Sequence, residues 1–87
     1  MAIRGGSENK LYRPPVKRSV TIAGHQTSIT LEPVFWRGLE SEAAKAALPI
    51  NALVARIDAD RLEADDPPNL ASAIRSWLYT QSVTDLS

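Results

Sequence analysis

Two short runs in which apolar and polar residues alternate lie in the first third of the chain. Val20 and Ile22 are apolar with a polar residue between them, and the alternation resumes over residues 27–31. A period of two is typical of β-strands that bury one face. Gly24 stands between the two runs. The pattern predicts either a hairpin that turns over residues 23–25 or a single strand preceded by an extended lead-in.

Two helices are predicted after the strands, and each is opened by a proline. A proline in the first helical position lacks only an amide that would have no partner within the helix. The first helix therefore begins at Glu32-Pro33 and ends at Leu48-Pro49, where the second begins and runs to about Arg61. The apolar residues that define the two faces are Phe35, Leu39, Ala43 and Ala46, widened by Trp36 and Ala47, and then Ile50, Leu53, Val54 and Ile57.

A third helix is predicted beyond an acidic, proline-rich linker at residues 62–68. Asn69 is placed to cap this helix, which extends over residues 69–82. Two interpretations of its apolar face are open: the helix packs on the chain's own thin core, or it binds another protein. The face consists of Leu70, Ala73, Ile74, Trp77 and Leu78.

Charge is unevenly distributed, although the formal net charge of the 87 residues is zero. Residues 1–25 contain five basic residues and one acidic residue, whereas the rest contains five basic and nine acidic residues. Such asymmetry predicts a basic arm on an acidic body within one small domain. The sequence pI of about 6.6 counts against nucleic-acid binding, because DNA-binding domains tend to be basic.

The residue types present argue against an enzyme. The chain has no cysteine and a single histidine, His25, so disulfides, thiolate metal sites and thiol nucleophiles are excluded and no hydrolase triad can be assembled. We expect no enzymatic activity, no cofactor and no bound metal. No apolar run reaches the length of about 18 residues that a membrane span needs, and the chain start lacks the apolar segment of a secretory signal. We therefore expect a cytoplasmic protein.

The order of strand, helix, turn and helix over residues 26–58 resembles the ribbon-helix-helix family of the Arc, MetJ and CopG type, above all at the strand-to-helix junction of residues 27–39. A closer resemblance is to a group of short bacterial ribbon-helix-helix proteins presumed to bind DNA. It runs from about Lys17 to Leu78 and rests on RSVTIAGH at 18–25, TSI at 27–29, Phe35-Trp36 and LVA at 53–55.

The resemblance implies a mainly α fold with a short β-ribbon, which is an intertwined homodimer with an extra C-terminal helix. A lone strand leaves both edges unpaired, so antiparallel pairing with its copy in a second chain satisfies one edge. The predicted organisation is a flexible basic arm (1–16), a ribbon-helix-helix DNA-binding domain (17–61), the linker (62–68) and the C-terminal helix (69–82). The predicted dimer core is Ile29, Leu31, Phe35, Trp36, Leu39, Leu53, Val54 and Ile57.

Three polar residues of the second run are the predicted readers of DNA bases. Period-two alternation puts Gln26, Ser28 and Thr30 on the face opposite Ile29 and Leu31. A two-stranded ribbon fits the major groove of DNA, where an amide side chain can pair with adenine and a hydroxyl can donate or accept. The alternative is that these three residues form only the solvated face of a strand.

Contacts to the DNA backbone are predicted at both ends of the domain. Lys17 and Arg18 lie upstream of the ribbon and would attract phosphate, or deter strand-edge aggregation instead. His25 stands next to the reading face, where a turn histidine without function is an equal alternative. The resemblance adds a phosphate held by the amides that open the second helix, here Ile50 and Asn51, although Pro49 departs from the Gly-x-Ser/Thr usual at that turn.

The function predicted from these features is that of a sequence-specific DNA-binding protein, a transcriptional repressor or autoregulator in a bacterium, associated with the nucleoid when bound. Its homodimer would read a pseudo-palindromic operator in double-stranded DNA, and several dimers would line up on tandem sites, as the resemblance implies. The second hypothesis is an antitoxin-like or adaptor protein whose C-terminal helix binds a protein partner.

Overall fold

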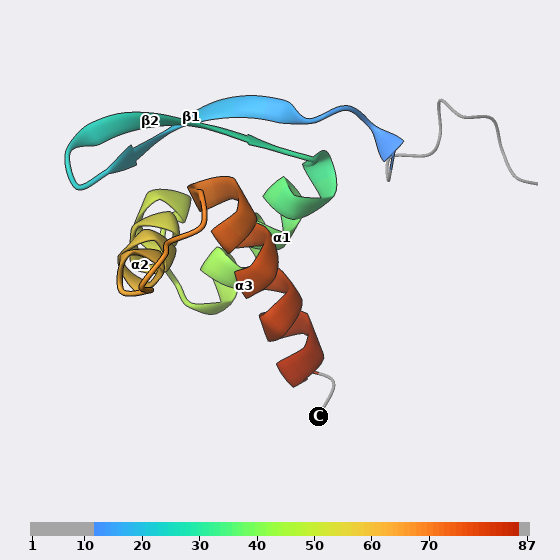
Figure 1. Cartoon of the computed structure of the whole chain (residues 1–87). Coiled ribbons are helices and arrows are strands. Elements are labelled where there is room, and N and C mark those ends of the chain that lie inside the picture. Colours follow the sequence, from blue (N-terminus) through green and yellow to red (C-terminus); the bar gives the residue numbers. More distant parts are fainter. Residues whose placement is uncertain (1–11, 86–87) are drawn as a thin grey trace, which may run out of the picture.

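A β-hairpin lies across one side of three helices in the computed structural model, which describes residues 12–85 (Figure 1). Helix α3 begins beside the hairpin and runs away from it, so its C-terminal end is the part of the helix farthest from the strands. The predicted arm falls largely on residues 1–11 and there lies outside the described residues. The elements in chain order are β1 (Val16–Ile22), β2 (His25–Leu31), α1 (Pro33–Lys45), α2 (Ile50–Leu62) and α3 (Leu70–Asp85).

The two alternating runs form a hairpin, so the lead-in alternative is wrong. Strands β1 and β2 pair antiparallel from Val16 opposite Leu31 to Ile22 opposite His25. The turn has two residues, Ala23 and Gly24, and both have positive φ angles, 51° and 85°. That combination matches the type I′ turn, whose twist suits a tight hairpin. The turn is one residue shorter than predicted, because His25 belongs to β2.

Strand β2 pairs along one edge with β1 of the same chain, and its pairing with a copy from a second chain stays a prediction. A two-residue turn brings β1 to the edge of β2 with a short loop, and short loops cost little chain entropy to close. The sheet formed by the described residues contains these two strands only. One edge of β2 is therefore satisfied within the chain, and its other edge is open.

The helix boundaries follow from backbone hydrogen bonds at the turns. Helix α1 ends at Lys45, Ala47 lies in the left-handed region at φ 56°, and the amide of Leu48 donates to the carbonyl of Ala43 over 2.9 Å. Pro49 then serves as the N-cap of α2. The predicted cap of α3 is confirmed, since the Asn69 side-chain oxygen accepts a hydrogen bond from the amide of Ser72 over 2.9 Å.

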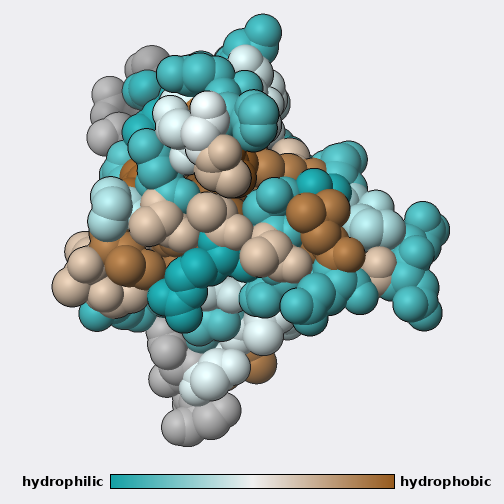
Figure 2. Space-filling model, turned by 90° about the vertical axis from the view of Figure 1, so that its left-hand side faces the viewer, coloured by the Kyte–Doolittle hydropathy of each residue, from teal (hydrophilic) through white to brown (hydrophobic). Residues whose placement is uncertain are grey.

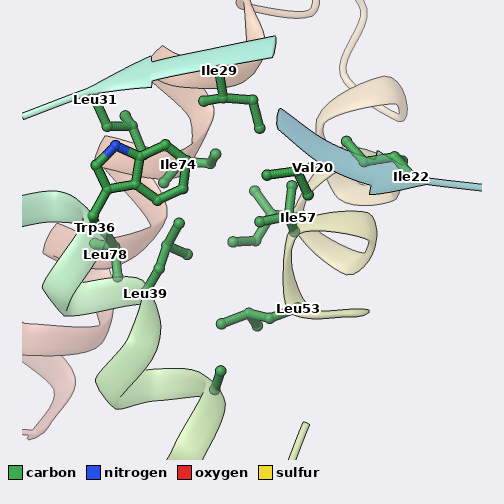
Figure 3. Close-up of a cluster of buried hydrophobic side chains, with 12 residues drawn as sticks. Val20, Ile22, Ile29, Leu31, Trp36, Leu39, Leu53, Ile57, Ile74 and Leu78 are labelled. Carbon is green, nitrogen blue, oxygen red and sulfur yellow. The ribbon is translucent and has the colours of Figure 1, made fainter. Parts of the chain in front are cut away.

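Every element contributes to one apolar core inside a single chain (Figure 3). The inner side chains of both strands point toward residues of α1 and α2, and α3 closes the remaining side. All the residues predicted for a dimer core lie in this core, with Phe35 packed at its margin. The buried set is Val20, Ile22, Ile29, Leu31, Trp36, Leu39, Ala43, Leu53, Val54, Ile57, Ile74 and Leu78.

Helix α1 turns a slightly different face to the core from the one predicted. Trp36 is only 4% exposed, while Phe35 is half-buried and Ala46 is exposed. The indole nitrogen of Trp36 donates to the carbonyl of Val16 over 2.9 Å. A buried indole needs such a partner, so this hydrogen bond favours the helix rotation that puts Trp36 beneath β1.

Helix α3 packs on the chain's own core, which agrees with the first of the two interpretations of its apolar face. Ile74 is fully buried and Leu78 is 8% exposed, while Leu70 and Trp77 are partly buried against them. Gly38 of α1 allows a close approach here, because a Cβ at this position would stand 3.4 Å from a methyl of Leu78. The side chains that were candidates for a partner interface are thus already used within the chain.

Among residues 12–85, no helix combines the length and the apolar character needed to cross a membrane.

Candidate nucleic-acid interface

The outer face of the hairpin, which we define as residues 17, 19, 21, 26, 28 and 30, points away from the helices. It consists of three cross-strand pairs, and every one of its side chains is exposed. At the top of Figure 2, where the hairpin lies, the surface is coloured from teal to white, as hydrophilic residues are. Only one of the six residues is charged. The pairs are Lys17 with Thr30, Ser19 with Ser28, and Thr21 with Gln26.

The predicted base readers Gln26, Ser28 and Thr30 are brought together on this face. The hydroxyl of Ser19 donates a hydrogen bond diagonally across the strands to the side-chain carbonyl oxygen of Gln26. This bond engages the oxygen and not the NH₂ group of the amide, which keeps its two donors for other partners. The outer face therefore offers donors and acceptors from both strands.

Lys17 and Arg18 are adjacent in sequence, but the structure places them on opposite faces of β1. Lys17 belongs to the outer face, opposite Thr30. The guanidinium carbon of Arg18 lies 4.4 Å from the centre of the Trp36 ring, and one of its nitrogens lies 3.5 Å from a carboxylate oxygen of Glu40. Arg18 thus joins β1 to α1 and is not brought together with the predicted base readers.

His25 lies at the tip of the hairpin and is exposed. It stands opposite Ile22 and shares a shallow cavity with Asp58 and Arg61 of α2. Within α2 these two residues are linked by hydrogen bonds of 2.8 and 2.9 Å. The C-terminal part of α2 is therefore the part that lies beside the hairpin tip.

Ile50 and Asn51 lie at the opposite end of α2 from that contact. The amides of Ala52 and Leu53 donate to the carbonyl of Pro49, over 3.0 and 3.2 Å. The amides of Ile50 and Asn51 come before these first hydrogen bonds of the helix. A helix of 13 residues is about 20 Å long. Within one chain, the structure does not bring these two amides together with the outer face of the hairpin.

Glu32 anchors the end of the hairpin to the helices. Its carboxylate lies 3.2 Å from the guanidinium of Arg75 on α3, which also lies over the ring of Phe35. The pKa of Glu32 is lowered, mainly by a backbone hydrogen bond, against a smaller raising effect of partial burial and with a further lowering by Arg75. The charged form of Glu32 therefore favours the folded junction between β2, α1 and α3.

Sequence reasoning missed two members of the outer face, Ser19 and Thr21 of β1. The signal was present, because both lie at alternate positions between the apolar residues Val20 and Ile22. The open question was whether β1 paired with β2 at all, and the register now puts Ser19 and Thr21 opposite two predicted readers.

In the part of the chain that the structure describes, no three acidic or histidine side chains lie together as metal ligands would.

Comparison with protein families supplies the deciding observation. A family model described as a ribbon-helix-helix domain matches residues 15–82. The chain belongs to the ribbon-helix-helix family. The match covers both strands of the hairpin and most of α3 as well as the two central helices. Searches of curated proteins and of solved structures found no match.

Ribbon-helix-helix proteins are generally DNA-binding transcription regulators or antitoxins, and they generally bind DNA as dimers. They are typically regulators without enzymatic activity. The two-stranded antiparallel sheet followed by three helices is consistent with a ribbon-helix-helix fold plus an extra C-terminal helix.

Proposed function

We propose that this protein is a sequence-specific DNA-binding transcription regulator, a repressor or autoregulator, that inserts the outer face of its β-ribbon into the DNA major groove. The observation that carries the proposal is the exposed, polar and nearly uncharged outer face in a member of a DNA-binding family. Four of the six side chains on this face are serines or threonines, and such short side chains allow the ribbon to approach base edges closely.

The proposed readers of bases are Gln26, Ser28 and Thr30. Each base pair presents a distinct pattern of donors and acceptors in the major groove, and a glutamine amide can make two hydrogen bonds to adenine. The free NH₂ group of Gln26 supports this role, because adenine N7 needs a donor. Ser28 and Thr30 add hydroxyl groups that accept or donate according to the base.

The proposed contacts to phosphate come from Lys17 on the outer face and from His25 at the hairpin tip. Phosphate contacts position a protein on DNA and supply affinity that depends on salt. The first amides of α2, those of Ile50 and Asn51, stay a proposed phosphate contact; they stand at the far end of that helix from the hairpin tip.

We further propose that two copies act together on a pseudo-palindromic operator, in the cytoplasm of a bacterium and at its nucleoid when bound. Two-fold symmetry in a protein is mirrored by two-fold symmetry in the DNA that it recognises. The family's general use of dimers supports this part of the proposal.

Selection from a randomised duplex-DNA library, followed by sequencing of the bound fraction, tests the proposal. We expect the wild-type protein to enrich one motif and the variant Gln26→Ala/Ser28→Ala/Thr30→Ala to lose it at the same salt concentration. The matched control is Ser76→Ala/Thr80→Ala/Thr84→Ala, which removes three exposed polar side chains from α3 and should enrich the wild-type motif. A folded wild-type protein that enriches no motif would contradict the proposal.

A further inference from the structure

A cavity of about 290 Å³ lies between the three helices. The end of α1, the middle of α2 and the second half of α3 line it, whereas no described residue of the hairpin does. Figure 3 shows Leu53, one of the lining residues, on the side of the core away from the strands. The volume is at the lower end of the range of roughly 300–1,000 Å³ that is usual for small-molecule sites, so it favours a small ligand.

The floor of the cavity is apolar. Leu53 and Ile57 of α2 line it and are each 3% exposed. Trp77 of α3 lines it as well and is partly buried against the core. An apolar group that moves from water onto such a surface gains free energy through the hydrophobic effect. The floor therefore favours a ligand with an apolar side chain.

Charges of both signs stand at the rim of the cavity, one turn apart on α2. Arg56 and Asp60 both line it and are exposed. Residues at this spacing have Cβ atoms about 5–6 Å apart, but a basic residue that precedes an acidic one is the less favourable order for an ion pair. Within residues 12–85 neither side chain has an ion-pair or hydrogen-bond partner. Both charges are therefore available to a ligand.

Two further polar side chains at the cavity have no hydrogen-bond partner among the described residues. They are Trp77 and Gln81 of α3, in contrast to Trp36, whose indole nitrogen donates to the carbonyl of Val16. An indole N–H can only donate, while a glutamine amide both donates and accepts. A ligand that carries an acceptor would satisfy the indole of Trp77.

The remaining charges at this and the neighbouring cavities are already engaged. Glu42 and Lys45, which also line the cavity, form an ion pair of 3.2 Å. In the shallow cavity at the hairpin tip, Asp58 and Arg61 are bonded to each other. In the groove between α1 and α3, Glu42 is the only charged residue among the described residues that line it. Unpaired charges of both signs thus meet an apolar floor only in the cavity between the three helices.

We propose that this cavity binds an α-amino acid with an aliphatic or aromatic side chain. Arg56 binds the carboxylate of the ligand and Asp60 binds its ammonium group, while the ligand side chain lies on the apolar floor. The two charged groups of an α-amino acid are attached to one carbon atom, so a single small molecule can reach two side chains that stand one helical turn apart. The inference is independent of the proposed function, because the cavity does not include the outer face of the hairpin.

Calorimetric titration of the full-length protein with L-leucine and with L-phenylalanine is the first test. We expect at least one of the two to bind saturably, with one molecule per chain. The matched amines, isoamylamine and phenethylamine, lack the carboxylate, and the matched acids, isocaproate and hydrocinnamate, lack the ammonium group. Each should bind at least about tenfold more weakly, because a hydrogen bond to a charged group is lost. The proposal is overturned if neither amino acid binds up to its solubility limit, or if the analogues bind equally well.

The second test replaces the two charges at the rim. Arg56→Gln and Asp60→Asn should each weaken binding by about tenfold. The matched controls are Arg37→Gln on α1 and Asp66→Asn in the linker, both at exposed positions that do not line the cavity, and they should bind as wild type does. All four replaced side chains are exposed, so circular dichroism should show an intact fold. Wild-type affinity in Arg56→Gln and Asp60→Asn would overturn the proposal.

The third test locates the ligand by the indole N–H signals of the two tryptophans in proton–nitrogen NMR spectra. Trp77→Phe identifies which signal belongs to Trp77. Saturation with the amino acid that binds should shift the signal of Trp77 and leave that of Trp36, which is hydrogen-bonded in the core, unchanged. A shift of Trp36 alone, or of neither signal, would place the ligand elsewhere and overturn the proposed site.

Discussion

The two faces of the hairpin are built from neighbouring residues of the same strands, but they differ in burial and in role. The inner face buries Val20, Ile22, Ile29 and Leu31 in the core, whereas the outer face leaves six polar side chains in contact with solvent. Hydrophobic burial is the main force that holds a domain of this size together. The stability of the fold therefore depends on one half of the ribbon, and the other half is available for recognition.

The largest expected effect comes from the inner face. Leu31 is fully buried, so Leu31→Ala should lower the free energy of unfolding by about 3 kcal/mol through lost burial and a residual cavity. Its neighbour Thr30 points outward, and Thr30→Ala should change stability by less than about 0.5 kcal/mol. Urea denaturation followed by circular dichroism measures both. Equal losses for the two variants would show that the faces are not separate.

Lys17 and Arg18 allow the two faces to be compared at neighbouring positions of β1, with smaller expected effects on stability. Arg18→Ala removes the contact with Trp36 and the ion pair with Glu40, and should lower stability by about 1 kcal/mol. Lys17→Ala should leave stability within about 0.5 kcal/mol, but should reduce the slope of log affinity for DNA against log salt by about 1. If Lys17→Ala destabilised the fold and Arg18→Ala changed only the salt slope, the assignment of faces would be reversed.

The turn that joins the two strands of the hairpin can be strengthened. Ala23 has a φ of 51°, a conformation that disfavours alanine, and asparagine before glycine is the preferred pair in a type I′ turn. Ala23→Asn should raise the free energy of unfolding by about 0.5–1 kcal/mol, measured as an increase in the urea midpoint without a change of slope. A loss of stability would contradict the turn geometry and the pairing that depends on it.

The junction below the hairpin should respond to acid. Because the pKa of Glu32 is lowered in the folded protein by its backbone hydrogen bond and by Arg75, the unfolded chain binds a proton more readily there. The stabilisation is present above the ordinary pKa of 4.5 and is lost as the pH falls below it. Glu32→Gln should therefore destabilise the protein at pH 7 and converge with wild type in acid. A constant difference between the two proteins from pH 7 to pH 3 would contradict this.

The outer position of Gln26, Ser28 and Thr30 could be predicted because strand alternation is strict. The same rule, counted back from Ile22, puts Arg18 on the inner face, but it could not be applied until β1 was known to be a strand. The hairpin remained one of two alternatives because Ala23 before Gly24 is a weaker turn signal than an asparagine at that position would have been.

The helical residues show where sequence patterns reach their limit. The apolar face of α1 was predicted as a stripe that included both Phe35 and Trp36. Which of the two side chains is more deeply buried depends on the hydrogen bond from Trp36 to Val16, a residue far away in the sequence. The two interpretations of α3 could not be separated by sequence, because an apolar stripe looks the same whether it meets its own core or a partner.

Methylation footprinting with dimethyl sulfate on the enriched DNA motif tests the central claim most directly, because this reagent modifies guanine N7 in the major groove and adenine N3 in the minor groove. The proposal predicts that the wild-type protein protects guanine N7 within the motif and that Gln26→Ala/Ser28→Ala/Thr30→Ala does not. Protection of adenine N3 alone, or protection by the variant equal to that of wild type, would contradict the assignment of the outer face of the hairpin as the surface that reads DNA.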